Sequence, residues 1–321
     1  MLNKNRLHGL LQISAVIAIL MFLSGCQSTC GCSSSKAETL NALIVTGQTN
    51  KYHNWRVSSA VFKYLLEDTG LFKVDMAISP PQGSDMSGFK PDFSAYDVVV
   101  VDYDGDSWPK ATEKAFVEYV KNGGGVVIYH SADNAFPDWP EFNEIIGLGG
   151  WGGRDEKWGP MVSWQDGMQL LDYSPGKAGA HPPRHDFQVI NRRPEHPILK
   201  GLPEKWMQPK DEVYGKMHGP VKNLTILSTA YSDPAKTGTG KNEPVLFTIN
   251  YGKGRVFHTT LGHVNPMAHS PEKPIESVGF IVTFQRGAEW AATGNVTQKV
   301  PADFKGGDKV EIRNLTGIKE L

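Results

Sequence analysis

The chain has 321 residues and a formal net charge of −1, with 33 Lys and Arg against 34 Asp and Glu. This balance excludes the basic footprint of a nucleic-acid-binding protein, so no nucleic-acid partner is expected. The three cysteines are Cys26, Cys30 and Cys32, and none follows Ser33. The body of the chain therefore lacks disulfide bonds and a thiol nucleophile, and its own core must stabilise it.

The N-terminal 25 residues have the pattern of a bacterial signal peptide. Lys4 and Arg6 precede an apolar run at residues 9–23, which is too short to span a bilayer comfortably. The run ends in Leu-Ser-Gly followed by Cys26, a string that is similar to the lipobox of bacterial lipoproteins. We therefore expect a signal peptide at 1–25, lipidation of Cys26, and an exported protein anchored to the cell membrane or outer membrane. The alternative is an ordinary signal peptide with an incidental cysteine.

Residues 26–37 are rich in serine and predict a flexible tether between the lipid and the folded body. Cys30 and Cys32 could form a C-x-C metal pair, but their place on a polar tether favours incidental thiols. The remaining chain divides into a body at 38–292 and a polar tail at 293–321, for which loose packing is expected.

Strand and helix patterns alternate through the first half of the body. Apolar, β-branched runs predict the strands 42–46, 72–76, 97–102 and 126–130. Helical periodicity follows Trp55 and again follows Pro109. Alternation at this spacing is typical of βαβ units, so the fold class is α/β, with a mostly parallel twisted sheet and helices on both faces.

The pattern is looser beyond residue 150. Residues 147–183 are rich in Gly, Trp and Pro and predict a long ordered excursion from the sheet. Further strands are expected at 186–190, 224–228, 244–249 and 255–260, and a last helix at 277–292.

In open α/β folds, ligands bind beyond the carboxyl ends of the strands. Three histidines follow predicted strands at this edge: His53, His130 and His263. Any one of them could cap a helix or satisfy a buried carbonyl. Together they could supply imidazole ligands to a divalent metal ion, which is the only cofactor that the residues indicate.

Other polar and aromatic side chains follow the same strands or lie in the second half. Glu212 and Tyr214 are two residues apart and point the same way if that segment is extended. Asp104 and Trp108 follow the strand at 97–102, and Asp102, Asp104 and Asp106 lack the glycine and distal glutamate of a calcium loop. The remaining candidates are Trp55, which offers a stacking face like that of Trp108, and His181.

Several strings in fixed order resemble the ThuA-like family, named for trehalose utilisation, over about residues 40–292. They are His53, the string GGGVVIYHSA at 123–132, His181-Pro182, His196-Pro197, Gly201-Leu202-Pro203, DEVY at 211–214, GKGRVFHTTLGH at 252–263 and the helix end near Gly287 to Ala291. The resemblance implies a fold like that of class I glutamine amidotransferases. It also implies handling of trehalose or other disaccharides through their 3-keto derivatives.

The sequence therefore predicts an enzyme, a hydrolase or lyase, that acts on a small-molecule glycoside or 3-keto sugar. His130, Glu212 and His263 are the predicted acid/base residues. His53, Trp55, Asp104, Trp108, His181 and Tyr214 are the predicted substrate-binding residues. Glutaminase activity is not expected, because His130-Ser131 stands where that fold carries its cysteine. The alternatives are a non-catalytic sugar-binding lipoprotein and a scaffold with a closed pocket.

Overall fold

The computed structural model describes residues 39–321. The predicted signal peptide at 1–25, the tether at 26–37 and the lipidated Cys26 lie outside the described residues. Among the helices of the described part, none combines the length and the apolar character needed to cross a membrane.

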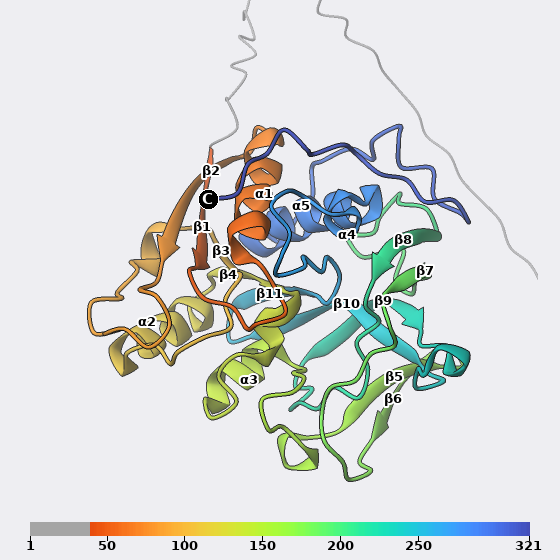
Figure 1. Cartoon of the computed structure of the whole chain (residues 1–321), viewed down its shortest axis with the longest axis horizontal. Helices are drawn as coiled ribbons and strands as arrows, with labels where there is room; N and C mark the ends of the chain where they lie inside the picture. The colour runs from red at the N-terminus through yellow and green to blue at the C-terminus, as the bar shows by residue number, and fades with distance from the viewer. Residues whose placement is uncertain (1–38) are drawn as a thin grey trace, which may run out of the picture. The chain divides into compact units, whose positions relative to one another are not determined.

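Five strands form the parallel part of one sheet (Figure 1). They are β1 (Leu40–Thr46), β2 (Phe72–Ile78), β3 (Val98–Val101), β4 (Gly125–Tyr129) and β11 (Gly254–Thr259). Their order is β2-β1-β3-β4-β11, and each neighbouring pair is parallel. All residues of β3 are buried, as expected for a valine run that is covered on both faces.

Helices cover both faces of this parallel part, as predicted. They are α1 (Trp55–Asp68), α2 (Lys110–Lys121), α3 (Pro140–Ile146), the short α4 (Lys273–Glu276) and α5 (Val278–Thr293). Ala42 and Ile44 of β1 pack in a core cluster with residues of α1 and α5. Leu43 and Val45 point to the other face and pack in a second cluster with residues of α2 and α3. The period of two along β1 thus divides the core into two layers.

The other half of the sheet is antiparallel, so the prediction of a mostly parallel sheet is correct for only one half. The order continues from β11 through β10 (Asn242–Tyr251), β9 (Leu224–Tyr231), β7 (His185–Asn191) and β8 (Lys205–Asp211). Each of these pairs is antiparallel. Gly252 and Lys253 alone connect β10 to β11, and a connection this short joins only antiparallel strands.

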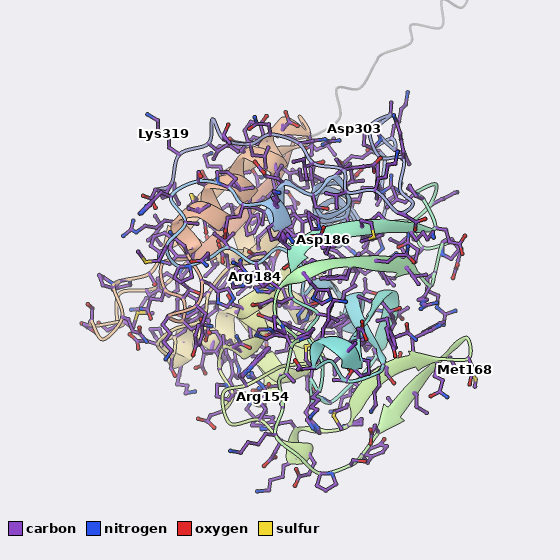
Figure 2. All side chains as sticks on the ribbon, turned by 45° about the vertical axis from the view of Figure 1, so that its right-hand side comes forward. Arg154, Met168, Arg184, Asp186, Asp303 and Lys319 are labelled. Carbon is purple, nitrogen blue, oxygen red and sulfur yellow. The ribbon has the colours of Figure 1, made fainter. Side chains whose placement is uncertain are left out.

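Three strands have no clear signal in the sequence. β8 contains Pro209 and two lysines, and it is tolerated because it lies at one end of the sheet order. β5 (Met161–Gln165) and β6 (Met168–Asp172) form a hairpin that joins the sheet through a single pairing of β5 with β10. Met168 at the start of β6 is mostly exposed (Figure 2).

The C-terminal segment 293–321 is packed against the body, which corrects the prediction of a loose tail. Phe304 and Leu315 are buried in the core, and Phe304 meets the ring of Trp206 edge-on. Isolated β-bridges also join this segment to residues of β8 and to Ser277. Phe304 and Leu315 anchor this segment, and Val296, Val300 and Ile318 also pack against the core. The segment carries polar side chains as well, such as Asp303 and Lys319 in Figure 2.

Glu243 in β10 gives the first testable prediction, which concerns stability. Burial raises the pKa of Glu243 to about 7, although a hydrogen bond from Thr239 and the charges of Lys241 and Lys216 lower it in part. The folded protein therefore binds this proton more tightly than the unfolded chain does. The stability that this tighter proton binding gives is fully present below the ordinary pKa of 4.5. It is lost as the pH rises through about 7.

We expect the free energy of unfolding of the wild type to fall by about 2–3 kcal/mol more than that of Glu243→Gln between pH 5 and pH 8. Urea unfolding of both proteins at the two pH values measures this difference. Equal pH dependence of the two proteins would show that Glu243 titrates normally. The absolute stability of the variant does not matter for this comparison.

Candidate functional site

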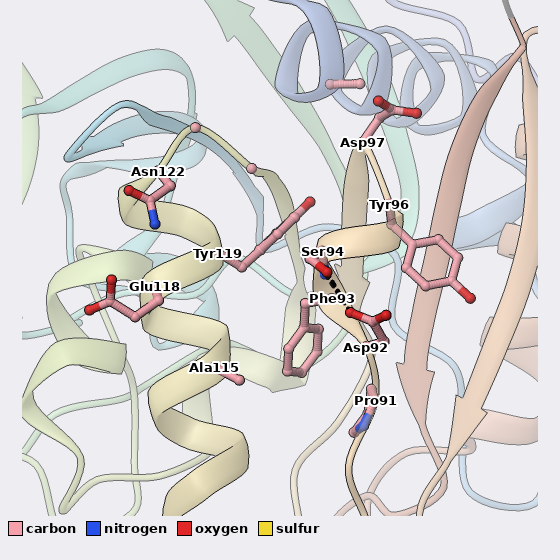
Figure 3. Close-up of a pocket in the computed structure, with 13 residues that line it drawn as sticks. Pro91, Asp92, Phe93, Ser94, Tyr96, Asp97, Ala115, Glu118, Tyr119 and Asn122 are labelled. Atoms are coloured by element: carbon pink, nitrogen blue, oxygen red, sulfur yellow. Dashed lines mark hydrogen bonds between the residues drawn. The ribbon is translucent and has the colours of Figure 1, made fainter.

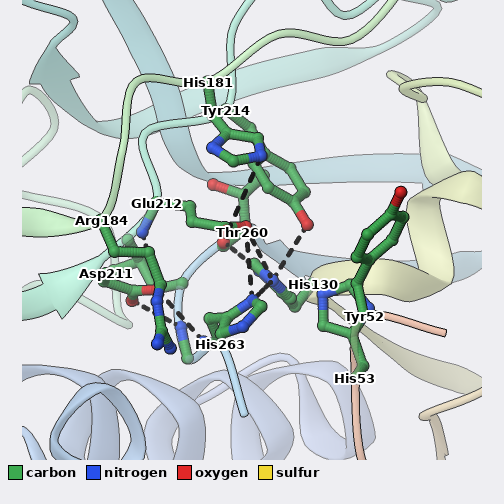
Figure 4. A network of polar contacts seen from close by, with 12 residues as sticks. Tyr52, His53, His130, His181, Arg184, Asp211, Glu212, Tyr214, Thr260 and His263 are labelled. Carbon is green, nitrogen blue, oxygen red and sulfur yellow. Dashed lines mark hydrogen bonds and ion pairs between the residues drawn. The ribbon is translucent and has the colours of Figure 1, made fainter. Parts of the chain in front are cut away.

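Four side chains from distant segments meet at the carboxyl edge of the parallel strands (Figure 4). His53 lies between β1 and α1, His130 follows β4, His263 follows β11, and Glu212 follows β8. One potential ligand atom from each residue lies within 4.8 Å of the others. We refer to these four residues as the His–Glu cluster.

The contacts inside the His–Glu cluster are short. His130 Nε2 lies 3.4 Å from His263 Nδ1 and 3.6 Å from Glu212 Oε2. His263 Nδ1 lies 3.4 Å from the same Glu212 oxygen. The ring of His53 meets those of His130 and His263 edge-on, at centroid distances of 4.9 and 4.8 Å. The distant imidazoles and the carboxylate therefore lie together at one edge of the sheet, as expected.

His130 has a strained backbone, and hydrogen bonds fix the orientation of its ring. Its backbone φ is 41°, a left-handed value that costs a non-glycine residue on the order of 1–3 kcal/mol. Its Nδ1 donates to the carbonyl of Thr260 at 2.6 Å, which leaves a lone pair on Nε2. Tyr214 Oη donates to that Nε2 at 2.9 Å. The carbonyl contact thus fixes the tautomer of the buried ring.

Asn50 fixes His53 in the same way. The backbone N–H of Tyr52 donates to Asn50 Oδ1, which identifies that atom as the amide oxygen. His53 Nδ1 donates to the same oxygen at 2.9 Å. Its Nε2 therefore carries the lone pair, and this buried atom has no hydrogen-bond partner among the described residues.

Asp211 connects the two segments that carry Glu212 and His263. Its buried carboxylate accepts hydrogen bonds from the backbone N–H groups of Gly262 at 2.7 Å and His263 at 3.1 Å. It also accepts from the backbone N–H of Glu212 at 2.9 Å. Asp211 is a positioning residue that we did not single out from the sequence, because this role depends on β8 lying opposite the loop after β11.

Burial and neighbouring charges keep the imidazoles neutral. Burial, followed by the effects of His263, His181 and Arg184, lowers the pKa of His53 to about 3. Burial also lowers the pKa of His130 well below its ordinary value, with His53 as the next cause. At neutral pH both rings are therefore uncharged and keep an unprotonated nitrogen.

Glu212 is the ionised member of the His–Glu cluster. Burial alone would raise its pKa, but the hydrogen bond from His263 and the interactions with His130 and His181 outweigh burial and lower the pKa to about 2. Oε2 of Glu212 faces His130 and His263, whereas Oε1 lies 3.7 Å from His181 Nε2. The carboxylate thus contacts the His–Glu cluster through one oxygen and His181 through the other.

A pocket of about 730 Å³ opens above the cluster. Most of the predicted site residues line it, and they are His53, Asp104, His181, Glu212, Tyr214 and His263. His130 is fully buried and lies behind this lining, in contact with Tyr214 and the cluster. His130 therefore supports the pocket from below and does not form its surface.

Two predicted stacking residues do not belong to this pocket. Trp108 is only 2% exposed and packs against Phe93, Phe116, Phe136 and Trp139 in the core, so its assignment as a sugar-binding face is wrong. Trp55, the first residue of α1, lines a neighbouring hollow and carries the guanidinium of Arg56 on its ring at 4.5 Å.

Trp151 places an aromatic ring at the pocket, where Trp55 and Trp108 were expected. Its ring meets Tyr214 edge-on at 4.7 Å and lies 5.9 Å from the ring of His181. It lines the pocket, as do Asn50, Asn134 and Arg184. A tryptophan between two pairs of glycines, at residues 149–153, is the signal that could have indicated it.

A second hollow, of about 530 Å³, lies at the opposite edge of the strands (Figure 3). Its lining includes Asp97 just before β3 and Gly124 just before β4. The phenol of Tyr119 donates to the Gly125 carbonyl, and Asp97 accepts from the backbone of Asn41. These two polar groups are already paired, and no histidine lines the hollow, so the pocket above the His–Glu cluster is the stronger candidate site.

A family model described as trehalose utilisation (ThuA) matches residues 41–291. The structure of a ThuA-like protein from Parabacteroides merdae is 52% identical in sequence, with a TM-score of 0.84, and the match covers 88% of this chain and 100% of that chain. A ThuA-like protein from Bacteroides uniformis is 20% identical with a TM-score of 0.54, over 83% of this chain and 98% of that one, and this likeness concerns the fold alone. Among curated proteins, none matches the chain.

Proposed function

The chain belongs to the trehalose utilisation (ThuA) family, and on that premise we propose that it is an enzyme of carbohydrate metabolism that acts on a disaccharide or its 3-keto derivative. The observation that carries the proposal is the His–Glu cluster at the floor of an open pocket. A pocket of about 730 Å³ is within the range of small-molecule sites.

The pocket offers groups for both binding and proton transfer. The ring of Trp151 provides an apolar face for a sugar, and Asp104, Asn50 and Asn134 offer hydrogen-bonding groups to hydroxyls. Glu212 and His181 face each other at 3.7 Å as a carboxylate and an imidazole. A ketone makes the adjacent C–H bond acidic, so a base held close to that proton is the group that such a substrate requires.

The main rival is a non-catalytic sugar-binding protein. Such a protein needs aromatic rings in its pocket, but it does not need titratable groups with strongly perturbed pKa values. Here the pKa of His53 is lowered to about 3 and that of Glu212 to about 2 at the same pocket. This electrostatic arrangement supports the enzyme over the binding protein. We do not propose glutamine hydrolysis, because the sequence has no cysteine after Cys32.

We also propose that the protein is exported and lipid-anchored through Cys26, on the basis of the lipobox-like string alone. An enzyme held in this way would meet disaccharides outside the cytoplasm.

Incubation of the purified protein with trehalose, other disaccharides and their 3-keto forms tests the function. We expect at least one of these sugars to be converted to a new product, detected by chromatography and NMR, and we expect no conversion without protein. Each reaction is run with and without added divalent metal. Binding of a sugar in calorimetry without any conversion would favour the sugar-binding rival, and neither binding nor conversion would contradict both.

A further inference from the structure

We propose that the His–Glu cluster binds one divalent transition-metal ion through three imidazole nitrogens and one carboxylate oxygen. This metal site would deepen the proposed function. Only the use of the ion in catalysis rests on that function. The ligands would be His53, His130, Glu212 and His263.

The spacing of the ligand atoms supports this proposal. Metal–nitrogen bonds of 2.0–2.1 Å in a tetrahedral site separate neighbouring ligand atoms by about 3.3 Å. His130 Nε2, His263 Nδ1 and Glu212 Oε2 form a triangle with sides of 3.4, 3.4 and 3.6 Å. These three atoms therefore match one face of a metal coordination shell with little movement. In the metal-bound form the proton of His263 would lie on Nε2 and leave Nδ1 free to bind the ion. His53 provides the fourth atom, because all four lie within 4.8 Å of one another.

The hydrogen bonds behind the ligands have the pattern of a metal site. A metal-binding histidine usually donates its other ring N–H to a carbonyl or carboxylate, which aims the lone pair at the ion. His130 donates to the Thr260 carbonyl, and His53 donates to the oxygen of Asn50. Both rings therefore hold the tautomer that a metal requires, and at His130 Nε2 the ion would replace the hydrogen bond from Tyr214.

His53 Nε2 is an independent observation that points to a missing partner. This atom is buried and makes no hydrogen bond among the described residues. A buried acceptor without a partner costs free energy on the order of 1–3 kcal/mol. A bound cation would satisfy the His53 lone pair.

The donor set also indicates the kind of ion. Ca²⁺ and Mg²⁺ prefer oxygen ligands, whereas three imidazoles and one carboxylate suit Zn²⁺, Mn²⁺, Fe²⁺, Co²⁺ or Ni²⁺. A bound ion of this kind would act as a Lewis acid on a carbonyl or hydroxyl oxygen of the sugar. Glu212 would bind through Oε2 and leave Oε1 facing His181, so the proton-transfer pair of the proposed function would persist.

The test measures metal binding directly, without reference to activity. The full chain is purified, its metal content is measured by mass spectrometry, and the chelator-treated protein is titrated with Zn²⁺ and Co²⁺. We expect one equivalent to bind, a rise in the thermal unfolding temperature, and the visible absorption of cobalt with nitrogen ligands.

Variants identify the ligands. His53→Ala and Glu212→Gln should each weaken binding at least tenfold. Two controls should keep the one-to-one stoichiometry: His269→Ala at an exposed histidine, and Tyr214→Phe, which removes only a hydrogen bond to His130. Circular dichroism checks that each variant is folded.

Failure to bind either ion at micromolar concentration, or undiminished binding by both ligand variants, would overturn the metal site. Stoichiometric binding without sugar conversion would leave the metal site standing and contradict the proposed function. Full sugar conversion by protein shown to be free of metal would leave the proposed function standing and would exclude a role of the ion in catalysis.

Discussion

Glu212→Gln is expected to lower the rate of sugar conversion by about two to four orders of magnitude. The substitution preserves the size of the side chain but removes the only carboxylate of the His–Glu cluster. Glu212 faces His130 and His263 through one oxygen and His181 through the other, so loss of its charge affects the cluster and the pocket together. The measurement is kcat and KM for the sugar identified by the product assay.

The control is Glu67→Gln on the exposed surface of α1, where the carboxylate pairs with Lys63. This variant should keep full activity. Thermal unfolding distinguishes a catalytic loss from unfolding, because Glu212→Gln should melt as a folded protein. Activity of Glu212→Gln within twofold of the wild type would remove this carboxylate from the mechanism.

The parallel half of the fold was predictable because its strands carry their own signal. A run such as Val98–Val101 is buried on both faces, so every residue is apolar and no register needs to be known. β8 has no such signal, since an edge strand can contain Pro209 and lysines without disturbing a neighbour. The packing of Phe304 and Leu315 was equally hidden, because scattered apolar residues in a mostly polar segment do not show where they dock.

Part of the pocket was predictable because parallel strands end at a common edge. That rule applies to His53, Asp104, His130 and His263, which follow strands or precede a helix in the parallel half. It does not distinguish a side chain that faces the pocket from one that faces the core. Trp108 therefore met the rule and yet packs among aromatic rings away from the site.

The residues that were missed depend on contacts between distant segments. Trp151 reaches the pocket only because its glycine-rich loop folds over Tyr214, and Asp211 becomes a connector only because Gly262 lies opposite. The contact of Asp211 leaves no period or spacing in the sequence, and the flanking glycines are the one local signal for Trp151. The site was thus predictable where the sheet determines it and unpredictable where loops complete it.

Arg154 holds the loop that completes the pocket, which leads to the second large expected effect. Its guanidinium is 1% exposed and donates to Asn143 Oδ1 of α3 and to the carbonyls of Asn134, Ala135 and Gly150. These bonds join the segment after His130 to α3 and to the loop before Trp151. Truncation would leave buried acceptors without a donor.

We expect Arg154→Ala to lower the free energy of unfolding by about 3–5 kcal/mol, the range for the loss of one partner from a buried charged network. Arg154→Lys should recover only part of this, because a lysine cannot reproduce the planar set of donors. Arg193→Ala is the control, since that exposed guanidinium only lies over the ring of Trp164 and its removal should cost about 1 kcal/mol or less. Urea unfolding measures all three. A loss below about 1 kcal/mol in Arg154→Ala would show that other contacts hold this loop.

Asn134 and Trp151 line the pocket, so Arg154→Lys should also raise KM for the sugar, while metal binding by the His–Glu cluster should be unchanged.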